Sequence, residues 1–201
     1  MKTIRIFIAA ALMLGFTPGA LALIAVDAAV GTRSLKVDPD GGDSKTFSGT
    51  PMRVAVHLDP IPLVPVSFGL GVGIWTVDGE SGSAFTKGGG GNEISLEVKG
   101  WIPFVPIVTP YGRLGYVISS ASNAVLEGDN SLKAKYLVGG TQLALGAEWS
   151  PLPLIGVIFE VVTSNLTFAL DNYEIGGQQV SSDADAKVTG TDILVGVSVG
   201  I

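Results

Sequence analysis

Apolar and polar residues alternate with a period of two along most of the chain beyond its first 22 residues. Between positions 66 and 75, one face carries Val66, Phe68, Leu70, Val72 and Ile74, and the other carries Ser67, Gly69, Gly71, Gly73 and Trp75. The same alternation occurs at 52–58, 93–102 and 192–201. Because successive side chains of a β-strand point to opposite faces, this pattern predicts strands rather than helices.

The alternating segments predict eight strands, at residues 23–32, 50–59, 65–78, 92–103, 107–119, 134–149, 154–170 and 187–201. The connections after the second, fourth and sixth strands are short and rich in proline, whereas the other connections are long and rich in Gly, Asp, Ser and Asn. Short periplasmic turns that alternate with long extracellular loops are typical of membrane barrels. The predicted fold class is therefore all-β, an eight-stranded antiparallel up-and-down transmembrane β-barrel.

The first 22 residues are predicted to be a Sec signal peptide, and residues 23–201 a single outer-membrane β-barrel domain. Lys2 and Arg5 precede the apolar run Ile6–Phe16, and Ala20 and Ala22 supply the small residues of a cleavage site. This run is shorter than the roughly 20 residues that a membrane-spanning helix needs. Later apolar runs are all interrupted by glycine, proline or charge, so membrane-spanning helices are not expected.

The composition suits a protein surrounded by lipid, with 47% hydrophobic residues, 15% charged residues and a mean hydropathy of +0.49. A net charge of −6 argues against nucleic acid as a partner. The absence of cysteine means that disulfides do not stabilise the fold. A soluble periplasmic carrier of lipocalin type is the alternative, because its strands also alternate. The small, glycine-rich polar face favours the membrane barrel, because such a face fits a narrow interior.

Two short segments, Pro110–Tyr116 and Leu145–Trp149, together with the strand pattern of residues 23–201, carry a family resemblance. The chain resembles the small eight-stranded bacterial outer-membrane β-barrel proteins of the OmpA/OmpX type and their OmpW-like relatives. The resemblance implies a place in the outer membrane of a Gram-negative cell envelope, contact with outer-membrane lipid and lipopolysaccharide, and insertion by the barrel-assembly machinery. Such proteins usually end in Phe or Trp, where this chain has Ile201.

Aromatic residues are candidates for anchors at the periplasmic interface of the membrane. The sequence offers Trp149, Tyr116, Phe104 and Phe68 for this role.

Alternation places a mixed-sign set of charged residues inside the predicted barrel: Asp27, Arg53, Glu97, Lys99, Arg113, Glu148, Glu160 and Asp192. Arg113, Glu148 and Glu160 fall at similar depths on neighbouring strands, which predicts a salt-bridged plug. The interior of an eight-stranded barrel is just wide enough for its own side chains, so general diffusion of solutes is not expected. A gated, porin-like polar pore is the alternative.

The inward glycines Gly69, Gly71 and Gly73 leave space along one strand, near Trp75 and Trp101. The OmpW-like resemblance implies a groove for small hydrophobic molecules there. The other interpretation is packing space for bulky inward neighbours such as Trp101.

No catalytic, cofactor-binding or metal-binding residues are predicted, and the protein is not expected to be an enzyme. The single histidine, His57, is predicted to point inward near the periplasmic end, away from the outer leaflet. Segment 38–43 has the aspartates of a calcium loop without the spacing to a bidentate Glu, although Asp183 and Asp185 could add oxygens. Segment 88–91 is predicted to be a loop tip and not a phosphate cradle, since no helix follows it.

These observations predict an integral outer-membrane β-barrel without a cofactor, which has a structural or surface-interaction role through its extracellular loops and an unidentified extracellular ligand. The alternative function is OmpW-like transport or binding of small hydrophobic molecules. A soluble periplasmic lipocalin-like carrier is a third hypothesis.

Overall fold

The computed structural model describes residues 24–39, 44–59, 64–78, 89–102, 107–125, 133–152, 154–175, 178–180 and 185–201. The predicted signal peptide, residues 1–22, lies outside this part of the chain. The described residues form the strands β1 (Ile24–Pro39), β2 (Lys45–Leu58), β3 (Val66–Val77), β4 (Gly89–Trp101), β5 (Val108–Val125), β6 (Lys133–Leu152), β7 (Ile155–Ile175), β8 (Gln178–Val180) and β9 (Asp185–Gly200).

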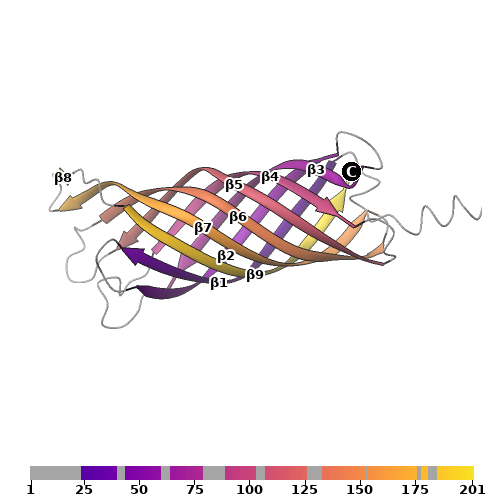
Figure 1. Ribbon diagram of the computed structural model, residues 1–201, viewed down its shortest axis with the longest axis horizontal. Helices are drawn as coiled ribbons and strands as arrows, with labels where there is room; N and C mark the ends of the chain where they lie inside the picture. Colours follow the sequence, from indigo (N-terminus) through magenta and orange to yellow (C-terminus); the bar gives the residue numbers. More distant parts are fainter. Residues whose placement is uncertain are drawn as a thin grey trace, which may run out of the picture.

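Eight of these strands close into an antiparallel barrel (Figure 1). Each strand from β1 to β6 pairs with the next one along the chain. β9 completes the ring by pairing with both β7 and β1. The short β8 pairs with β7 alone and lies outside the ring. The predicted fold class, an eight-stranded up-and-down barrel, is confirmed.

Among the described residues there is no helix long and apolar enough to cross a membrane.

One end of the barrel carries the first and last described residues, and β8 lies at the opposite end (Figure 1). The backbones of Ile24 and Ile201 exchange two hydrogen bonds, which fasten β1 to the end of the chain. The hairpin turns β2–β3, β4–β5 and β6–β7 lie at the same end. We call this the periplasmic end and the other the extracellular end, following the topology of outer-membrane barrels.

The outer wall of the barrel carries a belt of exposed aliphatic and aromatic side chains in its periplasmic half. On β2 the belt runs from Met52 to Leu58, and on β3 it runs from Phe68 to Ile74, with alternate side chains 42–60% exposed. β7 and β9 carry corresponding rows of Val, Ile and Phe. Water would make such a surface costly, whereas the hydrocarbon of a bilayer accommodates it.

Along each strand, the outward-facing residues change from apolar to polar at one position. This holds for the strands whose side chains are described on both sides of that position. The residue next to the belt on the extracellular side is Thr or Asn, at Thr32, Thr50, Thr76, Asn92, Thr141, Thr163 and Thr191. Beyond these residues, the exposed positions include Ser34, Lys36 and Lys187. We infer that this change marks the extracellular boundary of the hydrocarbon core.

The interior changes in the opposite sense toward the extracellular end. An apolar layer fills the barrel there, formed by Leu35, Trp75, Val117, Val138, Leu166 and Val188. Val37, Val77 and Phe168 pack against this layer, and the ring centroids of Trp75 and Phe168 lie 6.3 Å apart. The extracellular part of the barrel is therefore built like a soluble protein, with apolar side chains inside and polar ones outside.

This reversal explains why the predicted loops were wrong in extent. Residues 33–49 were predicted to connect two strands, but β1 continues to Pro39 and β2 already begins at Lys45. Segment 88–91 was predicted to be a loop tip, whereas Gly89–Gly91 belong to β4 and pair with β3. The alternation continues through these segments, but here the apolar side chains face inward and the polar ones face outward. A search for strands by their outward apolar residues therefore places the strand ends too early.

The predicted aromatic anchors lie in different places. Trp149 and Phe68 are exposed on the outer wall near the periplasmic end. The assignment of Tyr116 to that end is wrong, because it pairs with Thr141 at the extracellular boundary of the belt. Phe104 lies outside the described residues, as do Asp183 and positions 40–43 of the calcium-like segment.

A lysine placed in the belt should destabilise the barrel more than a lysine placed beyond its boundary. We expect Leu70→Lys to lower the free energy of unfolding in lipid vesicles by about 2–4 kcal/mol, because it places a charge near the centre of the belt. Thr76→Lys, further along the same face of β3, should cost less than about 1 kcal/mol. Equal losses in urea titrations of the two variants would contradict the assignment of the belt.

Candidate functional site

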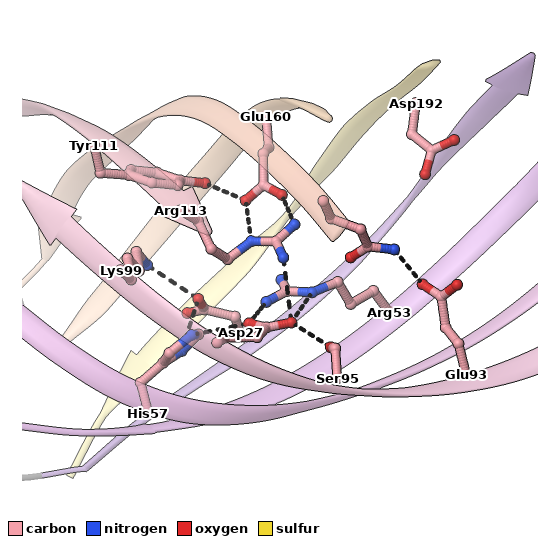
Figure 2. A network of polar contacts seen from close by, with 12 residues as sticks. Asp27, Arg53, His57, Glu93, Ser95, Lys99, Tyr111, Arg113, Glu160 and Asp192 are labelled. Atoms are coloured by element: carbon pink, nitrogen blue, oxygen red, sulfur yellow. Dashed lines mark hydrogen bonds and ion pairs between the residues drawn. The ribbon is translucent and has the colours of Figure 1, made fainter. Parts of the chain in front are cut away.

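The structure places all eight of the predicted interior charged residues inside the barrel, none more than 8% exposed. Arg33, His57 and Glu93 are buried beside them. We call these eleven residues the interior network: Asp27, Arg33, Arg53, His57, Glu93, Glu97, Lys99, Arg113, Glu148, Glu160 and Asp192. Figure 2 shows most of them facing one another across the interior.

The central part of the network joins four strands through two arginines and two glutamates. Arg113 on β5 pairs with Glu160 on β7, and its Nη1 lies 3.2 Å from Glu97 Oε1 on β4. Arg53 on β2 also pairs with Glu97 (Figure 2). The hydroxyl of Tyr111 donates a 3.0 Å hydrogen bond to Glu160. Each carboxylate therefore has at least two donors, which offsets the cost of burying its charge.

A second group lies toward the periplasmic end. Lys99 Nζ donates a 3.0 Å hydrogen bond to Asp27 and lies 4.4 Å from the ring centroid of Tyr111. The two ring nitrogens of His57 face different carboxylates, with Nδ1 3.4 Å from Asp27 and Nε2 3.1 Å from Glu97. His57 thus connects this group to the central one.

A third group adjoins the apolar layer at the extracellular end. Arg33 on β1 makes a bidentate pair with Asp192 on β9, at 2.8 and 2.6 Å. Gln142 donates a 3.0 Å hydrogen bond to Glu93. The guanidinium of Arg33 also lies 5.6 Å from the Trp75 ring, where a cation is attracted to the aromatic face. Arg33 therefore stands at the border between the polar and the apolar parts of the interior.

The predicted plug of Arg113, Glu148 and Glu160 is correct in one pair and wrong in the other. Arg113 binds Glu160, but Glu148 lies with Lys99, whose Nζ is 3.9 Å away. The strand register explains this difference: Arg113 is opposite Ala144 on β6, four positions from Glu148. Glu148 therefore lies closer to the periplasmic end than the approximate depths inferred from sequence suggested.

The sequence prediction missed several members of the network and several of the residues that bind to it. Arg33 lay in a segment predicted to be a loop, although continued alternation along β1 would have placed it inside. Glu93 and Ser95 share the inward face of β4 with Glu97, and this pattern was visible in the sequence. The parts played by Tyr111 and Gln142 depend on the register between strands, for which the sequence holds no local signal.

The three inward glycines of β3 face side chains rather than an open groove. A Cβ atom at Gly71 would lie 2.2 Å from Glu97 Oε1, and one at Gly73 would lie 2.8 Å from Glu93 Cγ. A Cβ at Gly69 would lie 2.5 Å from the His57 ring. The glycines make room for the network, so of the two interpretations the structure favours packing space. The occupants are Glu93, Glu97 and His57 rather than Trp101.

Trp75 and Trp101 do not line one groove, because they lie toward opposite ends of the barrel. Trp75 belongs to the apolar layer, whereas Trp101 pairs with Tyr111 near the periplasmic end. A shallow depression beside Gly69 does exist, among Phe68, Leu96, Leu114 and Tyr116. It opens through the outer wall of the belt, where acyl chains of the membrane would fill it.

Acidic groups outnumber basic groups inside the barrel. The buried acids include Asp59 at the periplasmic mouth, so among the described residues seven buried carboxyl groups face four buried lysine or arginine side chains. Beyond the end of β2, burial raises the pKa of Asp59 to about 6, and the positive charge of Lys99 acts in the opposite direction. Asp59 therefore takes up a proton at a higher pH than an exposed aspartate does, and the excess negative charge at this mouth falls as the pH drops through about 6.

Two small cavities lie within the network. One, of about 20 Å³, is lined by His57, Asp59, Lys99 and Glu148 among others. The other, of about 10 Å³, lies between Arg33, Arg53 and Arg113. Each has space for about one water molecule. Within the part of the chain that the structure describes, no cluster of three or more His, Cys, Asp or Glu side chains is arranged to hold a metal ion.

No protein-family description matches the chain, and no curated protein sequence matches it. Solved structures do match. Neisserial surface protein A (NspA) is 12% identical, with 89% of this chain and 97% of NspA aligned and a TM-score of 0.59. The outer membrane protein OprG from Pseudomonas aeruginosa is 12% identical over 92% of this chain and 99% of its own, with a TM-score of 0.54.

The outer membrane protease OmpT from Escherichia coli aligns less closely, at 12% identity over 89% of this chain and 96% of its own, with a TM-score of 0.47. At such low identities the likeness shows the fold, that of outer-membrane β-barrels. Together with the apolar belt, it supports an integral outer-membrane β-barrel protein.

The packing of Glu97 against Gly71 generates a direct prediction. Gly71→Ala should lower the free energy of unfolding by about 1–3 kcal/mol, because the added methyl group displaces a carboxylate that four partners hold in place. Gly112→Ala is the matched control, since a Cβ there has no neighbour closer than 3.9 Å. We expect the control to unfold like the native chain. Similar losses for both variants in urea titrations would show that Glu97 is free to move away.

Proposed function

We propose that the protein is a closed, non-enzymatic outer-membrane barrel that presents its extracellular end as a surface for interaction. The observation that carries the proposal is that side chains fill the barrel interior in two successive zones along its axis. The interior network occupies the membrane-embedded part, and the apolar layer occupies the extracellular part. A permeating ion would have to displace buried ion pairs and then cross a layer without polar groups, and both steps are costly.

The extracellular part of the barrel supports the second half of the proposal. β1 continues from Thr32 to Pro39, which adds roughly 18 Å of height at about 3.3 Å per residue and a tilt of about 40°. The outward residues there are polar and exposed. A rigid, water-exposed extension of this kind holds the connections at its rim away from the membrane. This arrangement suits contact with molecules outside the cell.

The state of the single histidine supports a non-enzymatic role. His57 is 1% exposed, and both of its ring nitrogens face carboxylates of the network. A general base needs access to a substrate proton within hydrogen-bond distance. His57 is enclosed in the periplasmic half of the interior, away from any molecule in the outer leaflet.

The packing beside the inward glycines does not favour transport of small hydrophobic molecules along them. The space beside Gly69, Gly71 and Gly73 is filled by network side chains.

Conductance measurements test whether the barrel is closed. The purified protein, once a heat-dependent shift on a detergent gel has shown that it is folded, should give no unitary current steps in a planar lipid bilayer at about ±100 mV, because the network and the apolar layer fill the interior. A general diffusion porin measured in the same lipid provides the positive control. Regular openings of the native chain at moderate voltage would overturn the proposal, and the gated-pore alternative would then replace it.

A further inference from the structure

The periplasmic end of the barrel is apolar at every corner. The exposed side chains at its turns include Val64 between β2 and β3, Ile102 between β4 and β5, and Leu152 at the end of β6. Ile24 and Ile201 are exposed at the remaining corner. Asp59 is the one charged residue in the three turn sequences, and it is buried toward the mouth of the barrel. Thus no exposed charged side chain occurs among the described residues of this rim.

Two exposed turn residues keep an apolar side chain in a backbone conformation that suits glycine. Ile107 has a φ of 72° and Leu154 a φ of 69°, both in the left-handed region. This conformation is uncommon for bulky residues, and Gly or Asn would adopt it with less strain. The polar or flexible turn residues expected next to water are thus replaced by exposed aliphatic ones.

The belt on the strands is too short to cross the membrane by itself. The stretch from Met52 to Leu58 on β2 covers about 15 Å along the barrel axis, and Ile94–Ile102 on β4 covers about 20 Å, at roughly 3.3 Å per residue and a tilt of about 40°. Outer-membrane barrels present an apolar band about 25 Å tall. The extracellular boundary is fixed by threonines and asparagine, so any further apolar height has to come from the periplasmic side.

We propose that the described residues flanking the three periplasmic turns lie within the acyl-chain region of the inner leaflet, so that this rim of the barrel is embedded in lipid. The turns would then complete the belt, with Ile102, Ile107 and Leu152 in contact with phospholipid. The alternative is that the bilayer becomes thinner around a short belt. In that case the turns would project into water.

The distribution of the apolar residues favours lipid over a protein partner. The four corners are spread around the ring, since they follow β2, β4, β6 and β9. A single docked protein would cover one side of the rim, whereas a leaflet surrounds all of it equally. The rim is also continuous with the belt, because Ile102 directly follows β4 and Leu154 directly precedes β7.

The chain contains no cysteine, so single-cysteine variants with a nitroxide spin label can measure the depth of the turns. Ile102→Cys and Leu152→Cys replace side chains that are 59% and 57% exposed. Leu70→Cys, in the middle of the belt, and Ser34→Cys, on the extracellular part, are the two reference variants. All four are reconstituted in vesicles of phosphatidylethanolamine and phosphatidylglycerol, where no other protein is present. A heat-dependent shift on a detergent gel shows that each variant is folded.

We expect the labels at Ile102 and Leu152 to collide with dissolved oxygen several-fold more often than with a water-soluble nickel chelate, as at Leu70. The label at Ser34 should show the reverse preference. If the turn labels instead resemble Ser34, the rim lies in water and the proposal is overturned. Two independent turn positions protect the test from one variant that fails to fold.

Discussion

The ion pairs of Arg113 with Glu97 and Glu160 are the interaction on which the interior of this barrel depends. They connect β5 to β4 and β7. Glu97 also contacts Arg53 and His57, both on β2, so these ion pairs link four strands. Both carboxylates are buried away from bulk water. β3 contributes glycines beside these groups, so that the glutamates of β4 fit between the walls. The small residues of one strand and the large charged residues of the next are thus parts of a single packing arrangement.

The reversal of polarity along the barrel axis follows from the change of surroundings. In the membrane, the outer wall must be apolar, and the inner wall can be polar provided that its groups satisfy one another. Above the threonines the outer wall faces water, and the inner wall then takes over the apolar role, as in any soluble barrel. Arg33 connects the two zones, because it pairs with Asp192 and lies over the ring of Trp75. The filled interior is therefore a consequence of stability in both zones, and the closed state proposed above follows from it.

Much of the fold could be predicted from the sequence because alternation is a local property. The rows Phe68–Ile74 and Ile193–Val199 are apolar at every second position, and the same alternation places the charged residues of β4 inside the barrel. The contact of Glu148 with Lys99 rather than Arg113 could not be predicted in this way, since it depends on the register between β5 and β6. The extension of β1 beyond Thr32 was missed for a different reason. In that part of β1 the apolar residues face inward and the outward residues are polar. A method that recognises strands by outward apolar residues therefore assigns the segment to a loop.

The most direct test of the account is a double-mutant cycle on Arg113 and Glu160, measured as free energies of unfolding in lipid vesicles. Arg113→Met alone should cost on the order of 2–4 kcal/mol, because it removes the one cationic partner of Glu160 in the network and one of the partners of Glu97, and both carboxylates are buried. Adding Glu160→Gln to it should cost far less than Glu160→Gln costs alone, with a coupling of at least about 1 kcal/mol. Losses that add to within about 0.5 kcal/mol would show that the two side chains act independently, and would contradict the central place given to this pair.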